Sequence, residues 1–171
     1  MKQLILFFSF LCSSILSFSQ PQIIKSCDDM TDKCHYLASE KMVLIDRENK
    51  QGFNIGPLFD FKNNKLGMDM VICKIANIGV CHENDKLILM FSDGSKLSFV
   101  SWNDFNCDGE AWFYVKDVDI NKMGSFAIVK AYIQNGRTYE SMSMEVPQEQ
   151  QNYFMSIISD MRQGVIVDLN K

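Results

Sequence analysis

Two short apolar runs on either side of Asp93-Gly94 give the clearest structural signal in the chain. Residues 86–92 and 95–102 are both of strand type, and Asp-Gly readily adopts the positive φ angles that a two-residue hairpin turn requires. Direct pairing across this turn gives a register in which opposed residue numbers sum to 187. It predicts one apolar face, which we expect to be buried. The residues of that face are Ile88, Met90, Leu97 and Phe99.

Asn135-Gly136 repeats this arrangement between residues 125–133 and 137–145. A two-residue turn here gives opposed residue numbers that sum to 271. The apolar face of this second predicted hairpin contains Ala127, Val129, Met142 and Met144.

Weaker turn signals add further strands. Residues 49–52 and Asn63-Asn64 interrupt strand-like runs, and residues 110–115 form an aromatic strand-like run. Together with the two hairpins, these segments predict seven or eight short strands. The strand pattern indicates a mainly β fold, either an antiparallel β-sandwich or an open barrel.

One C-terminal helix is expected at about residues 148–162. Pro147 suits the start of a helix, because its missing N–H is not needed there, and Gly164 is placed to end it. Tyr153, Ile157 and Met161 recur every four residues and form an apolar stripe that should cover a sheet.

The first 19 residues have the pattern of a signal peptide. Lys2 precedes an apolar run at residues 4–11, and the small-residue pattern of residues 17–19 follows. The run is shorter than the roughly twenty residues that a membrane span needs. We therefore expect residues 1–19 to be removed and residues 20–171 to form a single β-rich domain, exported to the periplasm or outside the cell, with no transmembrane segment.

The charge of the mature chain argues against two classes of partner. One of the 17 Lys and Arg residues lies in the signal segment, so 16 positive charges face 21 Asp and Glu residues, a net charge of −5. Nucleic acids and anionic membranes are recognised through clustered Lys and Arg, and the chain has no basic run. We expect neither as a partner.

Five of the six cysteines follow the signal segment, and export favours disulfides, with one thiol left over. When the register of the Asp93-Gly94 hairpin is extended away from the turn, Cys81 lies opposite Asn106, one position from Cys107. A bulge of one residue would bring the sulfur atoms of Cys81 and Cys107 together. This register predicts a Cys81–Cys107 disulfide.

The remaining cysteines are less constrained by spacing. Cys27 and Cys34 are too far apart on a helix or a single strand, so their pairing requires residues 28–33 to form a loop. The polar content of that segment permits a loop. Cys73 lies in an apolar run and is most simply a buried free thiol.

Metal sites have limited support in the sequence. Cys34-His35 and Cys81-His82 contain zinc-ligating residue types, but neighbours on a strand point to opposite faces. Residues 104–109 match the first half of a calcium loop, while position twelve is Val115 instead of a carboxylate. We expect a turn and no cofactor, with calcium as the alternative. The calcium ligands in that alternative are Asp104, Asn106 and Asp108.

Aromatic residues are concentrated between residues 99 and 114. Burial in a sandwich core is the expected arrangement, because large aromatic side chains dominate protein cores. Trp112 and Tyr114 share a strand face, opposite Phe113, and at least one of the two should be partly exposed. If Trp102, Trp112 and Tyr114 were exposed together, they would form a binding surface for a sugar or a protein.

No catalytic sequence motif is present, so a non-enzymatic binding or interaction module with an unknown protein or glycan ligand is the first hypothesis. The alternatives are a secreted hydrolase with a site around His82, and an inhibitor of an envelope enzyme with a protruding loop. The hydrolase hypothesis draws on His82, Glu83, Asp85 and Asp108, which a Cys81–Cys107 disulfide would bring together.

Three segments also carry a resemblance. They are Asp29-Met-Thr-Asp-Lys33, Gly79-Val-Cys-His-Glu-Asn-Asp85, and Ser101-Trp-Asn-Asp-Phe-Asn-Cys-Asp-Gly109 followed by residues 110–113. Together they resemble an uncharacterised family of small exported bacterial proteins. The resemblance implies a β-rich exported domain, assigns no activity and carries over no catalytic residue.

Overall fold

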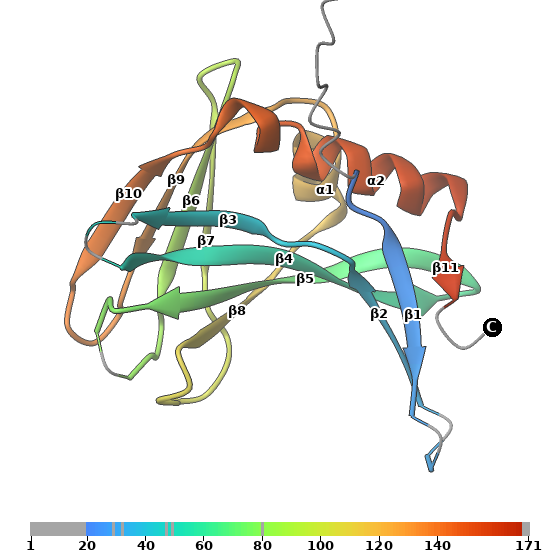
Figure 1. The fold of residues 1–171 in the computed structure, drawn as a ribbon, viewed down its shortest axis with the longest axis horizontal. Coiled ribbons are helices and arrows are strands. Elements are labelled where there is room, and N and C mark those ends of the chain that lie inside the picture. The colour runs from blue at the N-terminus through green and yellow to red at the C-terminus, as the bar shows by residue number, and fades with distance from the viewer. Residues whose placement is uncertain are drawn as a thin grey trace, which may run out of the picture.

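The computed structural model describes residues 20–28, 30–31, 33–46, 48, 50–79 and 81–168. The predicted signal peptide, residues 1–19, lies outside the described residues. Within them the protein is mainly β, and two sheets of seven and four strands form a sandwich with a C-terminal helix, as the strand pattern predicts (Figure 1). The described chain contains eleven strands, more than the seven or eight expected.

The larger sheet has the order β11-β1-β2-β4-β5-β8, with β3 also pairing with β4. Its strands are β1 (Ile23–Cys27), β2 (Cys34–Ala38), β3 (Met42–Asp46), β4 (Gln51–Lys62), β5 (Lys65–Ala76), β8 (Glu110–Tyr114) and β11 (Val167–Asp168). The smaller sheet has the order β10-β9-β6-β7. Its strands are β6 (Lys86–Phe91), β7 (Lys96–Val100), β9 (Ile128–Gln134) and β10 (Ser141–Glu145).

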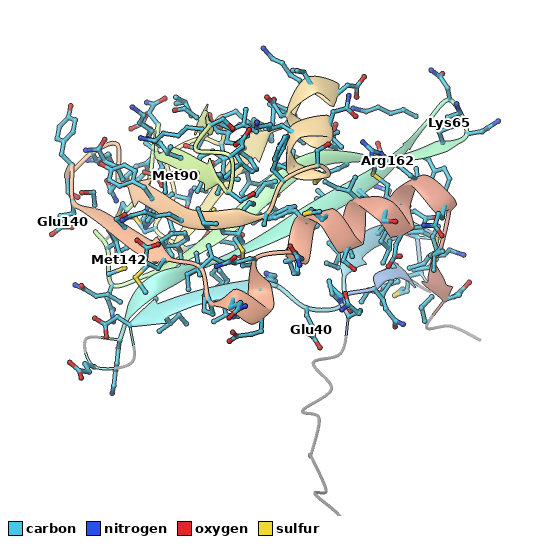
Figure 2. All side chains as sticks on the ribbon, turned by 90° about the horizontal axis from the view of Figure 1, so that it is seen from above. Glu40, Lys65, Met90, Glu140, Met142 and Arg162 are labelled. Atoms are coloured by element: carbon cyan, nitrogen blue, oxygen red, sulfur yellow. A yellow bond between two sulfur atoms is a disulfide. The ribbon has the colours of Figure 1, made fainter. Side chains whose placement is uncertain are left out.

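The weaker turn signals are both confirmed as hairpins. β3 pairs with β4 across the turn that follows Asp46, and β4 pairs with β5 across Asn63-Asn64. Both asparagines have positive φ angles, 53° and 61°, as a tight two-residue turn requires. This turn lies beside Lys65 at one end of the molecule, and the β9–β10 loop that holds Glu140 lies at the other end (Figure 2).

The register expected for the first hairpin is wrong by one residue. In the β6–β7 pair the opposed residue numbers sum to 186, because residues 92–94 form a three-residue loop with Gly94 at φ 81°. A shift of one residue exchanges the two faces of a strand. Leu87, Leu89 and Phe91 are therefore buried, whereas Ile88 and Met90 are only half-buried.

The second hairpin has a longer loop than expected. Opposed residue numbers in the β9–β10 pair sum to 275 instead of 271. The Asn135 side chain accepts hydrogen bonds from the N–H groups of Arg137 and Thr138, and so draws residues 135–140 into a loop. The shift of four residues is even, so Met142 and Met144 keep the inward face and pack against the core.

The C-terminal helix is confirmed, with a modified start. Residues Gln148–Gln150 after Pro147 form a 3-10 turn, and α2 (Tyr153–Gln163) follows. Gly164, in the left-handed conformation at φ 67°, ends the helix. The buried side chains of α2 are Tyr153, Phe154, Ile157 and Ile158. This apolar face covers the larger sheet (Figure 1).

A second helix, α1 (Asp117–Met123), was not expected from the sequence. The Asp119 carboxylate accepts a hydrogen bond from the Lys116 N–H and satisfies a donor at the start of the helix. Ile120 and Met123 are its buried residues. Two buried residues in seven give too weak a helical pattern to distinguish from a loop.

The cysteine predictions are confirmed. Cys27 and Cys34 lie opposite one another in the β1–β2 hairpin and form one disulfide, and Cys81 and Cys107 form the other. Cys73 is a buried free thiol.

Burial raises the pKa of the Cys73 thiol, because the thiolate would lose its hydration. We therefore expect thiol labelling of the native, oxidised protein to leave Cys73 unmodified, and labelling in denaturant to modify it alone. Non-reducing peptide mapping should recover the Cys81–Cys107 and Cys27–Cys34 peptides as linked pairs. Rapid labelling of the native protein would contradict the buried position.

Candidate functional site

Trp102, Trp112 and Tyr114 come together on the outer side of the larger sheet. Tyr114 stacks on Trp102, with ring centres 4.8 Å apart and planes at 21°, and Trp112 meets Trp102 edge to face at 6.0 Å. The exposed fractions are 46% for Trp102 and 54% for Tyr114, and Trp112 is half-buried. The expectation that Trp112 or Tyr114 would be partly exposed is therefore confirmed, whereas the expected burial of the aromatic residues in the core is wrong for Trp102, Phe105 and Tyr114. Phe113, on the opposite face of β8, is fully buried.

A shallow hollow of about 340 Å³ lies beside these rings. We call it the aromatic hollow. Its aromatic residues are Trp102, Phe105 and Trp112, and its polar residues are Asn103, Asp104, Asn106, Asp108 and Glu110. Tyr114 does not line the hollow and instead supports the Trp102 ring from the side. Half-exposed aromatic rings with several polar groups at one concave place are typical of small-ligand sites.

Two asparagine side chains shape the loop that carries the hollow. Asn103 Oδ1 accepts the Trp112 N–H at 2.9 Å, and Asn106 Nδ2 donates to the Glu110 carbonyl oxygen at 3.0 Å. These amides hold residues 101–109 against the start of β8. The sequence analysis treated Asn106 only as a metal ligand and did not single out Asn103, because an asparagine has the same sequence signal in any turn.

The loop is also attached to its neighbours at three points. The Cys81–Cys107 disulfide holds one side, and His82 and Asn106 exchange backbone hydrogen bonds of 2.7 and 3.1 Å. The Gly109 carbonyl oxygen accepts the Ile75 N–H at 2.6 Å. Gly109 has φ 71°, and a Cβ there would lie 2.8 Å from the Ile75 carbonyl oxygen, so the close approach requires glycine.

The candidate calcium ligands occupy a turn. The Asp108 N–H donates to Asn106 Oδ1 at 3.1 Å, while Asn106 Nδ2 is used by the backbone as described above. Asp104 and Asp108 are exposed. Within the described residues, no group of three or more His, Cys, Asp or Glu side chains is arranged to hold a metal ion.

His82 and Asp85, two of the four residues that the hydrolase hypothesis names, are in contact within the turn that precedes β6. His82 Nδ1 lies 2.8 Å from Asp85 Oδ2, and we assign the hydrogen to Nδ1 because a carboxylate oxygen accepts. Both residues are almost fully buried, with exposed fractions of 2% and 0%. Glu83 lies at the surface 3.9 Å from Arg137, and Asp108 lines the aromatic hollow. The His82–Asp85 pair therefore lies between the turn before β6 and the β9–β10 loop, and it does not line the hollow.

Asn135 and Ser101 complete this buried polar group. Asn135 Nδ2 donates to the Cys81 carbonyl oxygen at 2.9 Å, and Ser101 Oγ accepts the Asp85 N–H at 2.9 Å. The second Asp85 oxygen accepts the Gly136 N–H at 2.8 Å. The hydrolase hypothesis grouped His82 with Asp85 but did not include Asn135 or Ser101, because these two residues come from separate turns.

A scan against protein-family models gives no match, and searches of the curated proteins and of the solved structures also give none. The resemblance carried by the three sequence segments therefore stays a prediction. No helix in the described part of the chain has the length and apolar character needed to cross a membrane. The disulfides Cys27–Cys34 and Cys81–Cys107 are compatible with export.

Proposed function

We propose that this protein is an exported, non-enzymatic binding module that takes a neutral sugar at the aromatic hollow. The observation that carries the proposal is the half-exposed Trp102 ring, which lines a hollow of about 340 Å³ together with Trp112 and several polar side chains. The signal-peptide pattern and the two disulfides support export.

The lining of the hollow suits a sugar in two respects. A sugar ring offers a face of C–H groups that can pack on an indole ring, which has a large apolar surface. Its hydroxyl groups can donate hydrogen bonds to the carboxylates of Asp104, Asp108 and Glu110. Among the described residues, those that line the hollow include no cation, and the neighbouring Lys74 and Arg137 contact Glu110 and Phe105, so the carboxylates of Asp104 and Asp108 disfavour an anionic ligand.

The attachment of the loop supports binding of a small ligand. A flexible loop loses conformational freedom on binding, and this loss lowers affinity. Here the disulfide at Cys107, the backbone pairing at Asn106 and the contact at Gly109 already fix the loop.

Tryptophan fluorescence gives a direct test, because the two tryptophans of the chain both line the hollow. We expect a saturable change in emission with at least one neutral oligosaccharide from a panel of gluco-, galacto-, manno- and N-acetylglucosamine oligomers. We expect none with uronic-acid oligomers. Repeating the titration with calcium and with chelator tests the calcium alternative at Asp104.

Trp102→Ala should weaken sugar binding by about tenfold or more, because it removes ring stacking and buried apolar area. Calorimetry measures this loss without relying on the removed fluorophore. Tyr139→Ala, which removes an exposed aromatic residue outside the hollow, should leave the affinity unchanged. Equal affinity for the two variants would contradict the proposed site, and release of new reducing ends would favour the hydrolase alternative.

A further inference from the structure

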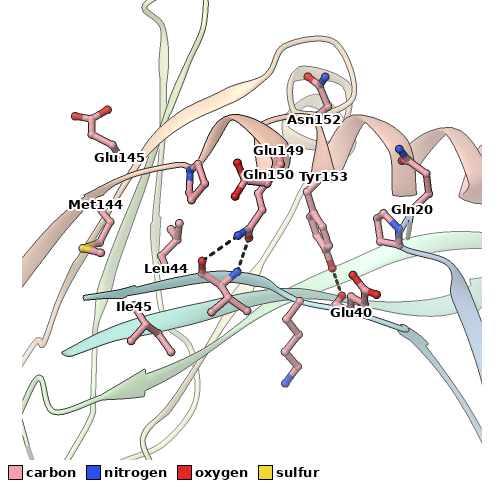
Figure 3. Close-up of a pocket in the computed structure, with 14 residues that line it drawn as sticks. Gln20, Glu40, Leu44, Ile45, Met144, Glu145, Glu149, Gln150, Asn152 and Tyr153 are labelled. Carbon is pink, nitrogen blue, oxygen red and sulfur yellow. Dashed lines mark hydrogen bonds between the residues drawn. The ribbon is translucent and has the colours of Figure 1, made fainter. Parts of the chain in front are cut away.

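A groove separates the edge of β3 in the larger sheet from β10 in the smaller sheet, below the 3-10 turn and the start of α2 (Figure 3). We call it the edge groove. Its volume is about 660 Å³, and β3 contributes Val43, Leu44 and Ile45 to it, while β10 contributes Met144 and Glu145. None of these residues lines the aromatic hollow, so the two features are independent.

One edge of β3 has no strand beside it within the described chain. β3 pairs with β4 alone, and β1 pairs only with β2 and β11. The hydrogen-bond ladder between β1 and β2 ends with a bond from the Ser39 N–H to the carbonyl oxygen of Gln22, the residue before β1. Pro21, which precedes Gln22, has no N–H and cannot continue this ladder. Within the described residues, this edge of β3 therefore has no hydrogen-bonded neighbour strand.

The Gln150 side chain shows which chemical group this edge accepts. Its Oε1 accepts the Val43 N–H at 2.7 Å, and its Nε2 donates to the Val43 carbonyl oxygen at 3.3 Å (Figure 3). A paired strand makes the same two bonds with its peptide groups. Because outward-facing backbone groups alternate along an antiparallel strand, those of Ile45 also point to the groove.

We propose that the edge groove binds an extended peptide segment of another protein, which adds to β3 as a further strand and displaces the Gln150 amide. Such strand addition is a recurrent mode of peptide recognition.

The side chains around the edge define the sequence of this peptide. Val43 and Ile45 project from the outer face of β3 and are each 42% exposed, so alternate apolar residues of the peptide would cover them. The charged residues that line the groove are Glu40, Lys41, Glu145 and Glu149. Glu145 is paired with Lys130 at 2.8 Å, so the carboxylates of Glu40 and Glu149 outnumber the Lys41 ammonium and favour Lys or Arg at the intervening positions.

A peptide of about nine residues that alternates valine and lysine, with blocked ends and a fluorescent label, is a suitable probe. We expect saturable binding to the purified, oxidised protein by fluorescence anisotropy. A peptide with glutamate in place of lysine should bind about tenfold more weakly or worse. N-methylation of every second peptide nitrogen, on the edge that faces β3, should abolish binding, because it removes the ladder donors.

Two variants have opposite expected effects. Gln150→Ala should strengthen binding of the valine-lysine peptide by about three- to tenfold, because the peptide no longer competes with the side-chain amide. Gln148→Ala, on the same 3-10 turn but outside the groove, is the matched control. Ile45→Pro should abolish binding while keeping the fold, since an edge strand tolerates proline where the N–H faces outward. Its melting temperature checks that the fold is kept.

The proposal is overturned if the peptide does not bind, if the N-methylated peptide binds equally well, or if Gln150→Ala leaves or lowers the affinity. Sedimentation of the protein alone tests whether a second copy of this chain occupies the groove. A dimer that Ile45→Pro converts to monomer would assign the edge to a second copy of this chain and would also overturn the proposal.

Discussion

Replacing Asp85 by alanine should lower the free energy of unfolding by about 3 to 5 kcal/mol. The carboxylate is fully buried and accepts hydrogen bonds from His82 Nδ1 and the Gly136 N–H, each at 2.8 Å. Its removal leaves the buried His82 Nδ1–H and the partly buried Gly136 N–H without this acceptor, and an unsatisfied buried polar group costs far more than the net value of a hydrogen bond. The effect is large because Asp85 joins the turn before β6 to the β9–β10 loop.

Chemical denaturation of Asp85→Ala and of the unmodified protein measures this loss. Glu83→Ala is the matched control, because Glu83 lies two residues away in the same turn and makes only a surface ion pair, worth about 0–1 kcal/mol. Equal stability of the two variants would show that water replaces the carboxylate without cost. Asp85→Asn should have an intermediate effect, since the amide oxygen can still accept from one of the two donors.

Phe154→Ala should destabilise the protein by about 3 to 5 kcal/mol. Phe154 is fully buried on the face of α2 that covers the larger sheet, and it meets Tyr153 edge to face with ring centres 5.1 Å apart. Truncation removes apolar contacts and leaves a cavity under the helix. For a protein of this size, the melting temperature should fall by roughly 6 to 20 °C.

Ser159→Ala is the control for this helix, because Ser159 is exposed on α2 and alanine is a good helix former. Its stability should remain within about 0.5 kcal/mol of the unmodified protein. A similar melting temperature for Phe154→Ala would mean that α2 contributes little to the fold.

The positions of the main strands and of α2 follow from the sequence. Turn residues such as Asn63-Asn64 and Asp93-Gly94 act locally, and alternating or four-residue spacing of apolar side chains reports directly on strand or helix. The Cys81–Cys107 disulfide was also predicted, because export favours disulfides and the extended hairpin register placed Cys81 opposite the neighbour of Cys107. The face of β8 that carries Trp112 was predicted for the same local reason.

The strand registers required the tertiary structure. Residues 87–91 are apolar at every position, so either face of β6 could have been the buried one from sequence alone. The choice depends on a three-residue loop around Gly94 and on packing against β9 and the larger sheet. In the same way, the side-chain bonds of Asn135 lengthened a turn that its Asn-Gly sequence predicted to be short.

Three features of the protein are thus set by its amino-acid sequence through local patterns: the β-rich class, the C-terminal helix and the paired cysteines. The packing of the Trp102 loop on β8, the full buried group around Asp85 and the edge groove were decided by tertiary structure. The last two join residues that are distant in the chain, such as Asp85 and Gly136, or Val43 and Gln150. The physical reason is that a local pattern determines how a segment folds, whereas contacts between segments depend on how the two sheets and the loops are arranged in space.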